Sequence, residues 1–221
     1  MDWTSWTQQV FGPAVPLNQA MAVFLGSYVL GCLATGYYLV RIWFGQDLRE
    51  LGSGSTGAKN VRRFLGLGGF LLTLMGDIGK GAVAVWVVRY FTLDDRLAAL
   101  AMLAVVLGHI WPFQLSFRGG KGMATSLGAL LLFDFRLTLL SVGVLLALFC
   151  FLRRTVLSGL IAFALVPLLA KMIMGRQVWE VIALSLLAGM VLVAHRKNLI
   201  DEAAQLAGRP PVQPKPDESF K

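Results

Sequence analysis

The sequence predicts an all-α integral membrane protein with seven transmembrane helices, its N-terminus outside and its C-terminus in the cytoplasm. Hydrophobic residues make up 57% of the 221 residues and charged residues only 14%, with a mean hydropathy of +0.69. That composition is too apolar for a water-soluble domain of this size. The net charge of +8 comes mainly from loops beside apolar runs, where cations set orientation and attract anionic headgroups. We therefore expect membrane lipids, and not nucleic acid, as the surrounding partner.

The apolar runs define the predicted helices, because a bilayer core requires about 20 apolar residues per helix. We expect residues 1–198 to form a single seven-helix membrane domain, followed by a cytoplasmic tail, residues 199–221. The tail contains four prolines from Pro210 to Pro216, and we expect it to be partly disordered. The predicted spans are residues 20–42, 66–90, 96–114, 121–134, 137–152, 156–174 and 178–195.

The distribution of cations between the loops predicts the orientation. With the N-terminus outside, five cations face outward, namely Arg89, Arg96, Arg136, Lys171 and Arg176. Fourteen face inward, namely Arg41, Arg49, Lys59, Arg62, Arg63, Arg118, Lys121, Arg153, Arg154, Arg196, Lys197, Arg209, Lys215 and Lys221. The loop after the first span, the loop before the fourth and the end of the seventh then emerge on the cytoplasmic side.

The loop after the first span, Gly52-Ser-Gly-Ser-Thr-Gly-Ala-Lys-Asn-Val-Arg-Arg63, combines glycines, hydroxyls and cations. Glycine allows successive backbone N–H groups to point into one concavity, so this composition predicts a phosphate site. A nucleotide P-loop is disfavoured, because Ala58 separates Gly57 from Lys59 and Asn60 stands where a hydroxyl is needed.

The loop before the fourth span contains a second group of glycines, Gly119, Gly120 and Gly122, around Lys121. It leads into a predicted helix whose N-terminal amides and dipole favour an anion. At the end of the seventh span, His195 and Asn198 are three residues apart on one predicted helix face. We expect these three segments to converge on one site.

Charged residues inside the second span, Asp77 and Lys80, are also three residues apart, and we interpret them as a pair that neutralises itself. Arg153 and Arg154 are interpreted as a topology signal. Cys32 and Cys150 lie inside apolar runs, and no metal-ligand spacing occurs, so neither a metal nor another cofactor is expected.

Three stretches of the sequence, GSGSTGAKNVRR, GHIWPFQLSFRGGKGMAT and HRKN, resemble the three motifs of the bacterial acyl-phosphate-dependent glycerol-3-phosphate acyltransferases. The resemblance extends from about Phe24 to Asn198, in order and at the expected spacing. It implies a multi-pass protein of the bacterial cytoplasmic (inner) membrane with its active site facing the cytoplasm. The implied reaction moves a fatty acyl group from acyl phosphate to the 1-hydroxyl of sn-glycerol 3-phosphate, giving lysophosphatidic acid and phosphate.

The same resemblance implies which residues act. The positions that match the family's polar substrate-binding residues are Ser53, Asn60, Arg63, His109, Lys121, His195 and Asn198. The composition of the two loops adds Gly54, Gly57, Gly119, Gly120 and Gly122 as substrate-binding positions. Of all these, Arg63, Lys121, His195 and Asn198 are the expected catalytic residues. Arg63 and Lys121 are expected to bind phosphate groups, with His195 or a substrate phosphate as the base. No metal is implied, and the partners are the two substrates, with a possible functional link to an enzyme that produces acyl phosphate.

This chain departs from the family pattern at several positions. The family usually has Asn at the position of Ser55 and Thr at the position of Lys59, and its Gly and Glu after the third motif are not matched beyond Asn198. Two other classes of protein fit the same polar residues: a lipid phosphatase with a histidine nucleophile, and a transporter of phosphate esters.

Overall fold

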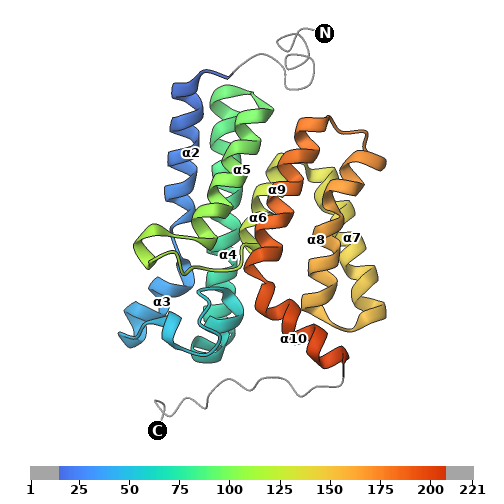
Figure 1. Ribbon diagram of the computed structural model, residues 1–221. Coiled ribbons are helices and arrows are strands. Elements are labelled where there is room, and N and C mark those ends of the chain that lie inside the picture. Colours follow the sequence, from blue (N-terminus) through green and yellow to red (C-terminus); the bar gives the residue numbers. More distant parts are fainter. Residues whose placement is uncertain (1–14, 208–221) are drawn as a thin grey trace.

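The protein is a bundle of helices in the computed structural model, which describes residues 15–207 (Figure 1). The helices are α2 (Leu17–Gly31), α3 (Thr35–Phe44), α4 (Ala58–Thr92), α5 (Asp95–Ile110), α6 (Met123–Phe133), α7 (Phe135–Leu152), α8 (Thr155–Met172), α9 (Val178–Ala194) and α10 (Arg196–Leu206). Two short 3-10 helices, Leu48–Glu50 and Phe113–Leu115, lie in the loops after α3 and α5.

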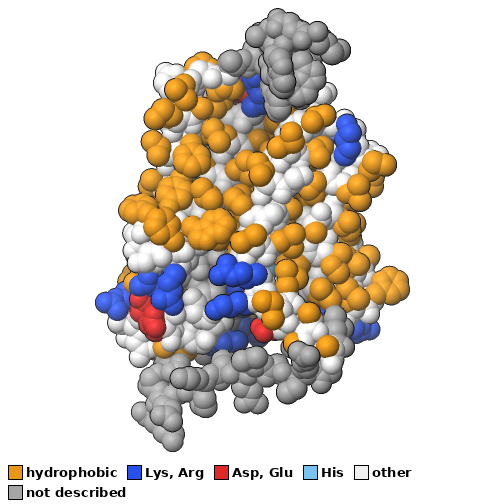
Figure 2. All heavy atoms as spheres, in the orientation of Figure 1, with side chains coloured by type: hydrophobic (Ala, Val, Ile, Leu, Met, Phe, Trp, Pro, Cys, Tyr) orange, Lys and Arg blue, Asp and Glu red, His pale blue; other side chains and the backbone are white. Residues whose placement is uncertain are grey.

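The bundle has the surface of a membrane protein. Figure 2 shows hydrophobic side chains over most of the height of the molecule, with Lys and Arg gathered towards its lower end. Exposed apolar side chains include Ile42, Met75, Phe91 and Phe151, each at least 69% exposed. Such a surface is stable only where lipid covers it.

Five helical segments among residues 15–207 are long and apolar enough to cross a membrane: Leu17–Phe44, Ala58–Thr92, Asp95–Leu115, Phe135–Leu152 and Thr155–Met172. A sixth is obtained if α9 and α10, bent by 62°, count as one. The predicted fourth span, 121–134, contains only the 11 residues of α6, about 16 Å of helix. All seven predicted segments are helical, and their number as complete spans stays a prediction.

The predicted first span, residues 20–42, is interrupted between α2 and α3. The freed carbonyls receive donors from elsewhere: Lys80 Nζ donates to Leu33 O (2.7 Å), and Gln114 Nε2 donates to Cys32 O (2.5 Å). A break inside a bilayer is stable only where such donors replace the lost helical bonds. Helix α4 is also broken, at Gly66 (φ 59°, ψ −153°), where the predicted second span begins.

Small residues allow the helix backbones to touch. A Cβ on Gly81 of α4 would lie 2.1 Å from Thr125 O of α6, and one on Gly128 of α6 would lie 2.0 Å from Ile78 O of α4. Glycine at a crossing is the usual means of close helix packing in membranes. These two reciprocal contacts hold the short α6 against α4.

Asp77 and Lys80 form the predicted buried ion pair, which is confirmed with an O–N distance of 3.0 Å. Both side chains are almost completely inaccessible. His109 of α5 joins them, with Nδ1 3.5 Å from the Asp77 carboxylate. The cluster therefore connects the break after α2 with α4 and α5.

The contact of α4 with α6 gives a first prediction. Gly81→Ala should destabilise the protein by about 1–3 kcal/mol, because the new methyl group meets the α6 backbone. Gly79→Ala, two residues away on the same helix, meets nothing within 4 Å and should be neutral or slightly stabilising. Thermal unfolding in detergent measures both variants, and equal midpoints would contradict the close-packing argument.

Candidate active site

The three polar segments meet at one end of the bundle, so the predicted convergence is confirmed. Thr56 N–H donates to Gly119 O (3.4 Å), which joins the first loop to the second. Lys121 Nζ donates to Asn198 Oδ1 (2.5 Å), which joins the second loop to α10. In Figure 1, α10 and the connection between α3 and α4 both lie in the lower part of the molecule.

The first loop is held in shape by the side chain of Asn60. Its Oδ1 accepts from Ser53 N–H (3.0 Å), and its Nδ2 donates to Leu51 O (3.0 Å) and Ser55 O (2.9 Å). The side chain is buried, at 2% exposure. Asn60 was predicted to bind substrate, but its amide is already occupied by the loop backbone, so the structure gives it a positioning role.

The backbone amides of the first loop are also occupied. Gly54 N–H donates to Leu51 O (2.9 Å), and Gly57 N–H donates to Ser55 Oγ (3.3 Å). Together with the bonds of Ser53 and Thr56, these contacts leave no nest of successive free amides in residues 53–57. In residues 53–57 the glycines therefore serve to fold the loop, and the predicted backbone cradle is left with the first amides of α4.

The second loop turns its glycine amides inward in the same way. Gly119 N–H donates to Ile110 O (3.1 Å) and Gly120 N–H to His109 O (3.0 Å). A Cβ on Gly120 would lie 2.0 Å from His109 Nε2. His109, predicted to bind substrate, is thus buried behind the loop between Gly120 and Asp77.

Free donors remain at the first turns of two helices. Helix α4 begins after Gly57 and helix α6 begins after Gly122 (φ 83°), and neither has a side-chain cap. The first amides of an uncapped helix have no intrahelical acceptor, and the helix dipole makes that end positive. Lys121 lies just before the N-terminus of α6, and Lys59 lies in the first turn of α4.

Arg63 lies over the first loop. A Cβ on Gly52 (φ 54°) would be 3.0 Å from Arg63 Nη1, so this glycine leaves room for the guanidinium. Arg63 is exposed and has no acidic partner in the part of the chain that the structure describes. The Ser53 side chain is also exposed, and both are accessible to an anionic ligand.

His195 follows the last residue of α9 and marks the bend between α9 and α10. Its Nδ1 lies 2.8 Å from Val191 O, so Nδ1 carries the proton and Nε2 is left as an acceptor. Burial lowers the pKa of His195, and the charges of Lys121 and Lys59 lower it further against the effect of the Val191 bond. His195 is therefore neutral at pH 7 and can accept a proton.

Lys121 shows how closely the cations gather. Burial lowers the pKa of its ammonium, and so do the charges of Lys59, Lys197 and Arg63, while Asp201 acts in the opposite direction. Sequence reasoning did not select Lys59 or Lys197. For Lys59 the available signal was its position one helical turn before Arg63, which places both cations near the same end of α4.

The first part of the predicted tail is helical, and the proline-rich part, for which disorder was predicted, lies outside the described residues. Residues 196–206 form α10, whereas residues 208–221 lie outside the described part of the chain. Arg154 Nη1 donates to Glu202 Oε2 (2.6 Å) and ties α10 to the start of α8. Arg154 is thus more than a topology signal, because it anchors the helix that carries Asn198.

The site contains no metal-binding group among residues 15–207: no three His, Cys, Asp or Glu side chains lie close enough together to hold an ion. Cys32 is buried and Cys150 exposed, and both are free thiols. The ligating capacity of the site is instead that of cations and uncapped helix ends. Such groups bind anions, phosphate above all.

The fold and the site together define a multi-pass integral membrane protein with cations and uncapped helix ends gathered at one end of its helical bundle. Residues 21–204 match the model of the glycerol-3-phosphate acyltransferase family. The chain belongs to that family.

Individual relatives support the assignment. The chain is 47% identical over 177 residues to glycerol-3-phosphate acyltransferase 1 of Desulfitobacterium hafniense, covering 80% of this chain and 87% of the relative. It is 37% identical over 183 residues to a glycerol-3-phosphate acyltransferase of Thermus thermophilus, covering 83% of this chain and 91% of the relative.

A solved structure has the same fold. It is PlsY (YgiH), an integral membrane glycerol 3-phosphate acyltransferase, in its glycerol 3-phosphate form, with a TM-score of 0.76 and 30% identity. The match covers 91% of this chain and 99% of the solved one. A second structure of PlsY, in the lysophosphatidic acid form, matches with a TM-score of 0.73 and 29% identity, covering 86% and 93%.

The anchoring of α10 gives the prediction of this section. Arg154→Gln should accelerate amide hydrogen exchange in Arg196–Leu206 about two- to fivefold, because a partly exposed ion pair contributes about 0.5–1 kcal/mol to local stability. Arg153→Gln is the matched control, since Arg153 donates to Cys150 O in the adjacent turn. Equal exchange in the two variants would show that the ion pair does not hold α10.

Proposed function

We propose that this protein transfers a fatty acyl group from acyl phosphate to the 1-hydroxyl of sn-glycerol 3-phosphate, giving lysophosphatidic acid and phosphate. Membership of the glycerol-3-phosphate acyltransferase family supports the acceptor and the acyl transfer. The observation that carries the proposal is the gathering of Lys59 and Lys121 near a neutral His195, with Arg63 near Lys121.

The charge of the site suits this pair of substrates. Acyl phosphate and glycerol 3-phosphate each bring a phosphate group, and two such groups repel each other at close range. Several cations and two positive helix ends offset that repulsion where the substrates lie side by side. Their position beneath a broad hydrophobic surface lets an acyl chain remain in the membrane while its phosphate reaches the cations (Figure 2).

The reaction follows from this arrangement without a covalent enzyme intermediate. The glycerol oxygen attacks the carbonyl carbon, the bond from that carbon to the phosphate oxygen breaks, and phosphate leaves with the electron pair. Arg63 and Lys121 bind the phosphates and stabilise the charge that develops on the carbonyl and leaving oxygens. The hydroxyl proton passes to Nε2 of His195 or to a substrate phosphate.

The remaining residues of the proposed site have three roles. Ser53 is exposed and is assigned to substrate binding. Asn198 is assigned to positioning Lys121, whose Nζ donates to its Oδ1. The others shape the loops around the substrates, through side-chain and backbone contacts or through the absence of a side chain: Gly54, Gly57, Asn60, His109, Gly119, Gly120 and Gly122.

We further propose seven membrane crossings, with the N-terminus outside and the site at the cytoplasmic face of the bacterial inner membrane. The excess of cations in the loops at the site end supports this orientation. The substrates then come from the cytoplasm and the inner leaflet. A functional link to an enzyme that produces acyl phosphate follows, because acyl phosphate is a reactive mixed anhydride.

The direct test incubates purified protein with palmitoyl phosphate and glycerol 3-phosphate. Lysophosphatidic acid and phosphate should form in equal amounts, and palmitoyl-CoA in place of palmitoyl phosphate should give no product. Phosphate release without an acylated product would identify a lipid phosphatase instead. Movement of glycerol 3-phosphate into sealed vesicles without acylation would identify a transporter.

His195→Ala should lower kcat about 100-fold or more at saturating substrate, because it removes the acceptor nitrogen at Nε2. Substrate affinity should change much less. Steady-state kinetics separates the two effects. Near-normal kcat would assign the proton to a substrate phosphate.

Arg63→Lys should lower kcat/KM about 10- to 100-fold, because an ammonium cannot reproduce the forked hydrogen bonds of a guanidinium to phosphate. The variant keeps the charge of the wild-type residue, so the comparison isolates geometry. Unchanged kcat/KM would mean that Arg63 acts only as a point charge.

Lys59→Met should move the acidic limb of the pH–activity profile to higher pH. The Lys59 charge lowers the pKa of His195, so its removal raises that pKa, and His195 becomes protonated at a higher pH. Arg62→Met removes an equal charge from a side chain that stacks on Phe70, and it should leave the limb in place. Equal profiles for wild type and Lys59→Met would refute the coupling.

A further inference from the structure

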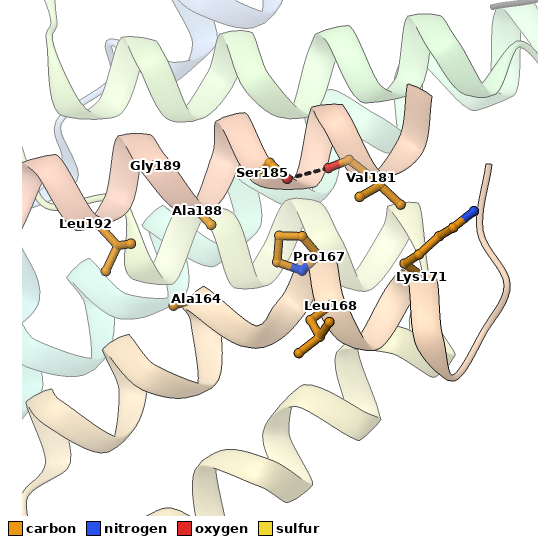
Figure 3. Close-up of a pocket in the computed structure, with 9 residues that line it drawn as sticks. All are labelled: Ala164, Pro167, Leu168, Lys171, Val181, Ser185, Ala188, Gly189 and Leu192. Atoms are coloured by element: carbon orange, nitrogen blue, oxygen red, sulfur yellow. Dashed lines mark hydrogen bonds between the residues drawn. The ribbon is translucent and has the colours of Figure 1, made fainter. Parts of the chain in front are cut away.

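A groove between α8 and α9 lies outside the proposed active site. Its volume is about 550 Å³, and Ala164, Pro167, Ala188, Gly189 and Leu192 contribute apolar surface to it, with Lys171 at one end (Figure 3). The nearby Ser185 hydroxyl is satisfied by its own helix, since it donates to Val181 O (2.7 Å). The groove therefore offers apolar walls and one cation.

Residues with short side chains and a proline inside α8 create the groove. Pro167 lies inside α8 and cannot donate the usual helical bond, and Ala164 and Ala188 have short side chains. A Cβ added to Gly189 would meet nothing within 4 Å. The space beside Gly189 is therefore open, and a flexible chain can enter it from the surrounding lipid.

The cation lies at the end of the groove that points away from the active site. Helix α8 begins beside Arg154, which bonds to Glu202 of α10, and Lys171 comes 16 residues after Thr155. At 1.5 Å per residue, Lys171 lies about 24 Å along the helix from the site end. A substrate chain that enters from the active site would bring its methyl end, and not its phosphate, to this ammonium.

Lys171 also differs from other cations at that end of the bundle. Arg176 bonds to Asp134 and lies 3.7 Å from Glu180, and Arg89 pairs with Asp95 (2.6 Å). Lys171 is exposed and has no acidic partner within residues 15–207. Its charge is therefore available to an anion in the headgroup region of that leaflet.

We infer that the groove between α8 and α9 binds an anionic phospholipid of the leaflet opposite the active site. One acyl chain fills the apolar groove beside Gly189, and the lipid phosphate pairs with Lys171. An acyl chain that enters the groove exchanges lipid chains for apolar side chains, and its free energy changes little. The charge on Lys171 therefore provides the preference for an anionic headgroup, about 1 kcal/mol for one cation near the surface.

The experiment reconstitutes the full-length protein in nanodiscs of phosphatidylcholine with a minor fraction of phosphatidylglycerol. Native mass spectrometry then counts the phosphatidylglycerol molecules retained. Wild-type protein should retain one phosphatidylglycerol preferentially over phosphatidylcholine. Lys171→Gln should reduce that preference about fivefold. Arg136→Gln is the control, because Arg136 is an exposed cation at the same end, in the first turn of α7.

A second pair of variants tests the groove itself. Gly189→Leu should fill the space and reduce lipid retention, whereas Gly143→Leu should not. Gly143 is a fair control because it lies on lipid-facing α7 and its Cβ also meets nothing within 4 Å. Lys171→Gln changes only an exposed side chain, so it tests the proposal even if Gly189→Leu fails to fold.

Two results would overturn the inference. One is equal retention of phosphatidylglycerol and phosphatidylcholine by the wild-type protein, which would show that Lys171 merely extends to water. The other is full retention by folded Gly189→Leu, which would place the lipid elsewhere. Neither result bears on acyl transfer, which is measured separately with the soluble acceptor.

Discussion

The active-site end of the molecule depends on one buried charge cluster inside the membrane. Lys80 Nζ contacts the Asp77 carboxylate (3.0 Å) and donates to Leu33 O (2.7 Å) at the break between α2 and α3. Asp77 in turn faces His109 of α5, and the His109 ring packs against Gly120. Buried charges are stable only when paired, so these contacts fix the relative positions of three helices and a loop.

On this base, the two glycine-rich loops act as scaffolds for cations. Asn60 and the backbone amides of Gly119 and Gly120 are consumed in folding the loops. Free binding capacity is left to Arg63, Lys121 and the uncapped ends of α4 and α6. The arrangement separates two tasks. The hydrogen-bonded polar groups make the loops rigid, and the cations without an acidic partner among residues 15–207 remain available to bind an anion.

The bend at His195 joins the membrane bundle to the surface helix α10. Because Nδ1 is bound to Val191 O, the ring is fixed with Nε2 as the acceptor. Lys121 reaches across to Asn198 on α10, and Arg154 holds Glu202 on the same helix. The bundle thus contributes the His195 imidazole, while α10 and the loops contribute the charges around it.

Sequence alone determined the helical membrane class, the positions of the apolar segments and the three polar segments, because hydropathy and glycine–cation composition are local properties. It also indicated the Asp77–Lys80 pair, whose spacing is local. Tertiary structure decided the rest: the breaks after Gly31 and at Gly66, the enclosure of Asn60 and His109, and the Arg154–Glu202 contact. Those features depend on which distant backbone and side-chain atoms meet, and residue spacing along the chain does not specify that.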